Sequence, residues 1–392
     1  MAAIVFFCIP AHGHTNPTLG VVRELTARGH RVIYYSFAEF REKIQQAGAE
    51  FVSCEGFDAG SRLTAAEGKK VGADLALSTR VLVDTTLALG EPVCRDMARI
   101  RPACIVADSM AVWGKAVAER LGIPFVCSMT TFAFNRESAK IMPHGLKETL
   151  GMLLSMGKVN GQIRRLQSAG YPVKNVLELI GCDENVPTVI YTSPMFQPCA
   201  ESFPKDFAFV GSSIRPVEHP VEKTRKVLIY ISMGTVNNDM LPLYQAFIRA
   251  FRDGPYQVII SAGASADVIN QEKMSENVFV YRTVDQIGVL EKTDIFFTHC
   301  GMNSASEGLY FGVPLVMLPQ TSEQKGVAHR VSQLGAGVLL KAPAPETIRQ
   351  AAEEILRDSR YRESAGRLGE SLRTCGGAGA AADCIEAAFQ GK

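Results

Sequence analysis

Residues 2–17 read AAIVFFCIPAHGHTNP, an apolar run followed at once by two histidines on either side of Gly13. A continuous apolar run of this length predicts a strand that is buried on both faces, as in a parallel sheet. In open parallel sheets, ligands bind beyond the carboxyl ends of the strands. His12 and His14 therefore stand where a side chain can cap a helix, pack, bind a metal or move a proton.

The rest of the first half repeats this pattern of short apolar runs and helical stretches. The helical stretches 17–30 and 111–122 carry apolar residues at helical spacing and end in or near glycine, and 136–180 is also helical in pattern. Strands alternating with helices predict an α/β fold, with helices on both faces of a parallel sheet. The predicted strands of this half are 2–9, 31–36, 50–54, 103–108 and 124–129.

The pattern starts again after the polar, proline-bearing stretch SSIRPVEHPVEKTRK, residues 212–226. We therefore predict two sheet domains, 1–215 and 226–378, with a linker at 216–225 and a helix at 379–392 that can pack back on the first domain. If the carboxyl edges of the two sheets face each other, the motifs that follow the strands line one cleft. The predicted strands of the second domain lie at 226–235, which ends in a turn, and at 258–263, 278–281, 294–299 and 314–320.

Composition narrows the class of protein. The 392 residues carry 41 Lys+Arg against 40 Asp+Glu, a net charge of +1, which gives no reason to expect nucleic acid or an anionic membrane as partner. Ten scattered cysteines without a C-x-x-C are typical of free thiols in a reducing compartment. No apolar stretch reaches the ~18 residues of a membrane span. We expect a cytoplasmic monomer.

The densest chemical signal is FFTHCGMNSASEG, residues 296–308. A strand ends at His299, Gly301 permits a tight turn, and Asn303-Ser304 opens a helix whose free N–H groups suit a phosphate. Glu307, one turn further, can bind a pair of ribose hydroxyls. The alternative is an ordinary capped helix with a packed histidine. Glu323-Gln324, after the next strand, can bind sugar hydroxyls or simply begin a solvated helix.

These stretches together resemble the family 1 glycosyltransferases of the GT-B fold, above all the bacterial macrolide and flavonoid UDP-glycosyltransferases. PAHGHTNPTLGVVREL is similar to their G-H-x-N-P stretch, and THCGMNSASEG…VPLVMLPQTSEQ to their nucleotide-sugar signature. The resemblance implies two Rossmann-like domains facing each other across a cleft, with His14 as catalytic base and Asp108 orienting it. It implies donor contacts from Thr235, Val284, Gln286, His299, Gly301, Asn303, Ser304, Glu307, Glu323 and Gln324.

The chain departs from the family at the base-binding stretch. Many relatives have W-x-P-Q there, with a tryptophan that stacks on uracil, whereas this chain reads Thr283-Val284-Asp285-Gln286. The only tryptophan is Trp113, in the other predicted domain. Selectivity for uridine over thymidine donors is therefore expected to be relaxed.

The resemblance implies the activity that we expect from the sequence. An inverting, metal-independent transfer would move a hexose, glucose above all, from a UDP-sugar to a hydroxyl of a flavonoid, phenol, steroid or macrolide. No other cofactor is implied, and no D-x-D metal motif occurs in the chain. Apolar side chains in the first domain suggest a deformable acceptor pocket, although each can equally be core. The candidates are Met110, Trp113, Met129 and Phe132.

Other functions remain open at this stage. A non-catalytic nucleotide- or ligand-binding protein, a GT-B nucleotide-sugar epimerase and a transferase with a lipid-linked acceptor share parts of the pattern. A nicotinamide-dependent oxidoreductase is disfavoured, because the first strand is not followed by G-x-G-x-x-G.

Overall fold

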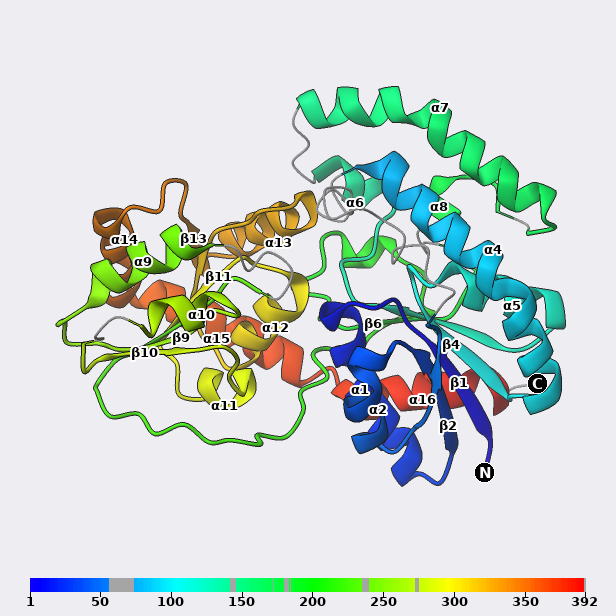
Figure 1. Cartoon of the computed structure of the whole chain (residues 1–392), viewed down its shortest axis with the longest axis horizontal. Helices are drawn as coiled ribbons and strands as arrows, with labels where there is room; N and C mark the ends of the chain where they lie inside the picture. The colour runs from blue at the N-terminus through cyan, green and yellow to red at the C-terminus, as the bar shows by residue number, and fades with distance from the viewer. Residues whose placement is uncertain are drawn as a thin grey trace. The chain divides into compact units, whose positions relative to one another are not determined.

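The computed structural model describes residues 1–55, 74–141, 146–171, 173–179, 183, 185–234, 240–271 and 275–390, which form two units that each contain one parallel sheet (Figure 1). Unit 1 comprises residues 1–192, 197–213 and 375–392, and unit 2 comprises 193–196 and 214–374. Within these described ranges, no helix is long and apolar enough to cross a membrane.

The sheet of unit 1 has the strand order β3-β2-β1-β4-β5-β6-β7, and every described pairing is parallel. Its strands are β1 (Ala3–Phe7), β2 (Arg31–Ser36), β3 (Glu50–Ser53), β4 (Cys104–Asp108), β5 (Phe125–Met129), β6 (Thr188–Ile190) and β7 (Phe207–Phe209). Its helices are α1 (His12–Ala27), α2 (Arg41–Gln46), α4 (Leu75–Ile100), α5 (Val112–Leu121), α6 (Arg136–Ile141), α7 (Leu146–Ser168), α8 (Val176–Leu179) and α16 (Gly377–Gln390), with short 3-10 turns at Ala38–Phe40 and Ala200–Ser202.

Side chains of β1 alternate between two hydrophobic layers. Ile4 and Phe6 pack with α1 and α16 on one face, whereas Val5 and Phe7 pack with α4 and α5 on the other. Both faces are therefore covered by helices, which is why the first strand reads as a continuous apolar run. This confirms the predicted α/β class with helices on both faces of a parallel sheet.

Unit 2 repeats the plan with the strand order β10-β9-β8-β11-β12-β13, again with parallel pairings. Its strands are β8 (Leu228–Ser232), β9 (Gln257–Ser261), β10 (Val278–Tyr281), β11 (Ile295–Thr298), β12 (Leu315–Met317) and β13 (Gly337–Leu339). Its helices are α9 (Leu241–Phe251), α10 (Ser265–Ile269), α11 (Gln286–Leu290), α12 (Met302–Tyr310), α13 (Ser322–Gln333), α14 (Pro345–Arg357) and α15 (Ser359–Arg373).

The stretch 216–225, which we predicted to be a linker, is hydrogen-bonded to unit 2. Gln257, on β9, accepts from the N–H of Thr224 at 2.8 Å and donates to the carbonyl of Glu222 at 3.0 Å. Asp285 accepts from the N–H groups of Glu218 and His219. These contacts satisfy the backbone of a segment that has no regular structure of its own.

Helix α16 belongs to unit 1, although it is the last element of the chain (Figure 1). Its buried residues Ala381, Ala382 and Ile385 join the hydrophobic layer that contains α1. Arg28, at the end of α1, pairs with Glu386 at 2.8 Å, and His30 contacts the same carboxylate at 2.7 Å. The small residues of α16 allow it to lie close against its neighbour.

Candidate active site

His14 lies in the first turn of α1 and contacts a buried carboxylate. Its Nδ1 is 2.8 Å from Oδ2 of Asp108, whose side chain is 0% exposed, while the His14 side chain is 20% exposed. Asp108 is the last residue of β4, which pairs in parallel with β1 so that Phe7 faces Ala107. The parallel register therefore brings two residues that are 94 positions apart to the same edge of the sheet.

The Asp108 carboxylate is hydrogen-bonded through both of its oxygens. Oδ1 accepts from the backbone N–H of Met110 at 2.9 Å, and Oδ2 faces the imidazole. A carboxylate next to Nδ1 favours a proton on that nitrogen, because an ionised carboxylate can only accept. The lone pair that can take a proton from a substrate is then on Nε2 of His14.

Thr130 is a further neighbour of this imidazole that the sequence did not suggest. Its hydroxyl oxygen lies 3.0 Å from Nδ1 of His14. Thr130 directly follows β5, so its position at the carboxyl edge of the sheet could have indicated a site residue. A single threonine after a strand is too common to support that prediction.

His12 has different surroundings. Its Nε2 contacts Glu39 at 2.8 Å, and its ring meets Phe40 edge-on with ring centres 4.9 Å apart. The two histidines of PAHGHTNP thus bind different carboxylates, and only His14 reaches the carboxyl edge of β4. His12 therefore packs against Phe40, which is one of the four roles open to it from the sequence.

The predicted acceptor residues lie mostly in the interior of unit 1. Trp113, Met129 and Phe132 are each 2% exposed, whereas Met110 is half-buried. Trp113 packs in the layer of Phe7, and Met129 packs in a cluster with Phe207. Trp113 and Met129 are thus part of the hydrophobic core of unit 1, and an acceptor role for the four residues stays a prediction.

In unit 2, His299 follows β11 and sits between two glycines. A Cβ atom added to Gly234 would lie 2.7 Å from the imidazole, and one added to Gly301 would lie 2.6 Å from it. Burial lowers the pKa of His299 to about 4, so the ring is neutral near pH 7. A backbone hydrogen bond with Ser232 acts in the opposite direction, but the effect of burial on the pKa is larger. His299 can therefore contribute a hydrogen bond to an anion, but not a positive charge.

Four of the predicted donor residues are joined in one hydrogen-bond network. Nε2 of Gln286 donates to Glu307 at 2.5 Å and lies 3.4 Å from the Ser304 hydroxyl. Asn303 donates to the other carboxylate oxygen of Glu307 at 2.9 Å. Tyr230, on β8, donates to the Gln286 carbonyl at 3.1 Å. Burial raises the pKa of Glu307 above its ordinary value, although the bonds from Gln286 and Asn303 act in the opposite direction.

Glu323 and Gln324 begin helix α13 and are already used by the backbone. Glu323 accepts from the N–H of Met302, the first residue of α12, at 3.3 Å. Gln324 forms a capping box with Thr321, and its carbonyl accepts from the N–H of Gln320 at 2.8 Å. The amide oxygen of Gln324 therefore stabilises the helix start, which leaves its amide nitrogen as the group that can face a ligand.

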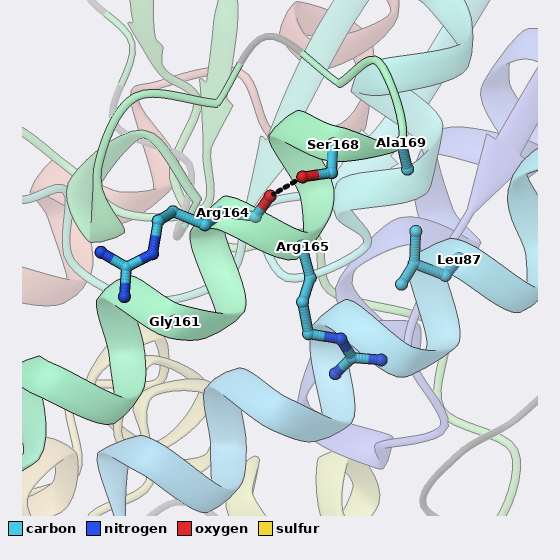
Figure 2. Close-up of a pocket in the computed structure, with 6 residues that line it drawn as sticks. All are labelled: Leu87, Gly161, Arg164, Arg165, Ser168 and Ala169. Atoms are coloured by element: carbon cyan, nitrogen blue, oxygen red, sulfur yellow. Dashed lines mark hydrogen bonds between the residues drawn. The ribbon is translucent and has the colours of Figure 1, made fainter.

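Two of the predicted donor residues remain, Val284 and Thr235. Val284 is half-buried, just before α11, and Thr235 lies outside the described residues. The pocket drawn in Figure 2 lies at α4 and α7 in unit 1 and contains none of the predicted site residues. Its lining consists of Leu87, Gly161, Arg164, Arg165, Ser168 and Ala169.

Comparison with known proteins supports both the fold of two parallel-sheet units and the resemblance of the motifs. Residues 218–372, nearly all of unit 2, match the family model described as UDP-glucoronosyl and UDP-glucosyl transferase. A solved structure described as the glycotransferase of kitacinnamycin superposes with a TM-score of 0.85, at 26% identity over 99% of this chain and 98% of that one. The resemblance inferred from the motifs is thereby confirmed, and so is the fold of two parallel-sheet units.

Curated relatives extend the likeness over the whole chain. The chain is 30% identical to the uncharacterized UDP-glucosyltransferase YojK of Bacillus subtilis (strain 168), covering 100% of this chain and 98% of YojK. It is 31% identical to the NDP-glycosyltransferase YjiC of the same organism, covering 97% of this chain and 95% of YjiC. Because this identity extends through both units and beyond the short motifs, the chain belongs to the UDP-glycosyltransferase family.

Proposed function

We propose that this enzyme transfers glucose from UDP-glucose to a hydroxyl group of a hydrophobic small molecule, with inversion at the anomeric carbon and without a metal ion. The observation that carries the proposal is the 2.8 Å hydrogen bond between His14 and the buried Asp108, at the carboxyl edge of a parallel sheet. Family membership supplies the reaction class, and this pair supplies a base suited to it.

In this proposal Nε2 of His14 removes the proton from the acceptor hydroxyl. The acceptor oxygen forms a bond to the anomeric carbon as the bond from that carbon to the diphosphate oxygen breaks, and UDP leaves with the electron pair. Asp108 holds the Nδ1 proton and stabilises the imidazolium that forms. Attack from the face opposite the diphosphate converts an α-linked donor into a β-glycoside.

The donor half of the proposal rests on unit 2. Helix α12 is nine residues long and begins at Met302, so its first N–H groups favour a diphosphate. Glu307 presents two carboxylate oxygens, which suit the two adjacent hydroxyls of a ribose. The neutral His299 can donate one further hydrogen bond to the leaving group as its negative charge grows.

The choice of substrates has separate support. The likeness to YojK, which is described as an uncharacterized UDP-glucosyltransferase, supports the proposal of glucose and UDP. YjiC is described as an NDP-glycosyltransferase, and Thr283 cannot stack on a base, so we propose that TDP-glucose is also accepted. The acceptor class, a hydrophobic flavonoid, phenol, steroid or macrolide, is proposed from the resemblance of the sequence motifs to the bacterial macrolide and flavonoid UDP-glycosyltransferases.

Replacing either histidine of PAHGHTNP tests the proposal. His14→Ala should lower turnover with an aliphatic alcohol acceptor by ~10²–10⁴-fold, the usual contribution of a general base, and leave UDP affinity unchanged. His12→Ala is the matched control, because His12 binds Glu39 and not Asp108, and it should keep nearly full turnover. Wild-type turnover in His14→Ala would overturn the assignment of the base.

Three further measurements on the wild-type enzyme complete the test. Proton NMR of the product should show a β-glycoside, and an α-linked product would contradict a single displacement. Activity should persist in excess EDTA, whereas loss that Mg²⁺ or Mn²⁺ restores would contradict the metal-free mechanism. Mass spectrometry that finds an epimerised nucleotide sugar and no glycoside would replace transfer by epimerisation.

A further inference from the structure

Asp285 is a buried carboxylate beside the donor network that the proposed chemistry does not use. Its side chain is 2% exposed, and it accepts from Nη2 of Arg215 at 2.5 Å. It also accepts from the backbone N–H groups of Glu218 at 2.7 Å and His219 at 2.8 Å. Burial by itself raises the pKa of Asp285, but the bonds from His219, Glu218 and Arg215 bring it below the ordinary value. The carboxylate is therefore charged and fully hydrogen-bonded.

Asp285 immediately precedes α11, at a position where aspartate usually caps its own helix. Here its side chain makes no capping bond to α11. It binds instead the segment 215–219, which follows unit 1 in the chain and belongs to unit 2. Since α11 contains only five residues, its orientation depends on outside contacts more than on its own hydrogen bonds.

The same segment lies directly on the backbone of α11. A Cβ atom added to Gly288 would lie 2.5 Å from the carbonyl oxygen of His219. Any larger residue at position 288 would push the segment away from the helix. Gly288 thus allows residues 215–219 to lie close to α11, and Asp285 holds them there by hydrogen bonds. In the W-x-P-Q motif of many relatives, proline occupies the position of Asp285, and proline has no side-chain acceptor for these bonds.

The next residue, Gln286, connects α11 to the predicted ribose carboxylate. Tyr230 donates to its carbonyl oxygen, which orients the amide so that its nitrogen points to Glu307. A shift of the first turn of α11 would therefore move the donor that orients one oxygen of Glu307. Arg215, held by Asp285, is also close enough for its charge to lower the pKa of Glu307, which burial raises.

We infer that Asp285 is a positioning residue for the nucleoside half of the donor: it fastens α11 to segment 215–219 and, through Gln286, holds Glu307 in the orientation that accepts two ribose hydroxyls. This inference rests on the proposed function, because it assigns the ribose to Glu307. It adds a structural link between the segment that connects the two units in the chain and the binding of nucleotide.

The test is calorimetric titration of the full-length enzyme with UDP, combined with donor-saturation kinetics and a thermal unfolding midpoint. Asp285→Ala should weaken UDP binding roughly tenfold, within the usual range of coupling between sites, and raise the KM for UDP-glucose by the same factor. The kcat at saturating donor should stay within about twofold, because the base and the acceptor are untouched. Asp285→Asn, which keeps an acceptor for a backbone N–H group, should recover part of the loss.

Asp294 provides a matched control, because it contacts Lys223 and Leu228, which follow segment 215–219 in the chain. Its carboxylate accepts from Lys223, from the N–H of Leu228 at 2.8 Å and from Arg362 at 2.8 Å. Within the described part of the chain, no hydrogen bond or ion pair joins Lys223, Leu228 or Arg362 to a predicted donor residue. Asp294→Ala should therefore lower the unfolding midpoint while UDP affinity stays within about twofold.

The outcomes separate the inference from the function on which it rests. Equal loss of UDP affinity in Asp285→Ala and Asp294→Ala, or no loss in Asp285→Ala, would overturn the positioning role. Undiminished UDP binding in Glu307→Ala would instead overturn the assignment of the ribose site itself. If Asp285→Ala does not fold, Asp285→Asn and Arg215→Gln decide the question by the same titration, since each weakens the contact without removing all of it.

Discussion

Asp108 in unit 1 and Glu307 in unit 2 are both shielded carboxylates near the carboxyl edge of a parallel sheet, but their partners differ in kind. Asp108 faces an imidazole, which can carry a proton, and one backbone N–H group. Glu307 faces the side-chain amides of Gln286 and Asn303, which do not ionise near neutral pH. This difference supports the proposal that the first site moves a proton and the second binds hydroxyl groups.

The two sites also differ in how their parts are assembled. Asn303 and Glu307 are four residues apart on one helix, where side chains meet without help from the rest of the fold. His14 and Asp108 meet only because β1 and β4 are parallel neighbours. From the proposed roles, we expect a substitution of His14 or Asp108 to lower the turnover rate, and a substitution of Glu307 to lower the affinity for UDP.

The first prediction concerns the carboxylate of the first site, which asparagine can replace without a change in size. Asp108→Asn should lower kcat by about 10²-fold, less than His14→Ala, because the amide can still accept a hydrogen bond but no longer stabilises the imidazolium. UDP affinity, measured by titration, should not change. A loss of UDP affinity equal to the loss of kcat would mean that Asp108 supports the fold of the enzyme and not the proton transfer.

A second prediction concerns His299, the buried histidine of unit 2. The pKa of His299 is about 4 in the folded state and 6.5 in the unfolded chain, so only the unfolded chain binds a proton between these values. The free energy of unfolding must then fall as pH falls through this window, by about 2 kcal/mol between pH 7.5 and 5. His299→Gln cannot be protonated and should show a smaller decrease.

Urea unfolding of both proteins at pH 7.5 and pH 5 measures this difference. The exposed His329, which contacts Gln333, provides the control, and His329→Gln should keep the acid dependence of the wild type. Parallel pH profiles for wild type and His299→Gln would show that His299 is not held neutral by burial.

The smallest expected effect concerns the base-binding edge of unit 2. Thr283 is exposed and too small to cover a pyrimidine ring, so Thr283→Trp should tighten UDP binding by about 1 kcal/mol, roughly fivefold. Thr283→Val, which has the same size as threonine and no aromatic ring, is the control. If the tryptophan variant binds UDP no more tightly, base recognition in this chain does not use a stacking surface at position 283.

Much of the fold and many of the site positions could be predicted from the sequence, because both depend on local patterns. Apolar runs such as 2–9 show strands that are buried on both faces, and the motif at 296–308 contains its own turn, helix start and carboxylate. The role of Thr130 could not be predicted, since its contact with His14 spans 116 positions. Trp113 was predicted as an acceptor residue and lies in a core cluster of unit 1, since apolar pocket walls and apolar core look alike in one sequence.

The sequence by itself determined that this chain has two parallel-sheet units and belongs to the glycosyltransferases, because hydrophobic periodicity and motif spacing are properties of contiguous residues. The tertiary structure added which side chains touch. It places His14, and not His12, against Asp108, a pair that the family resemblance had implied, and it shows that Gln324 caps its own helix and that Asp285 binds a segment 66 positions away. The physical reason is that a hydrogen bond depends on distances of a few ångströms between atoms, which strand order and register establish and which no local pattern contains.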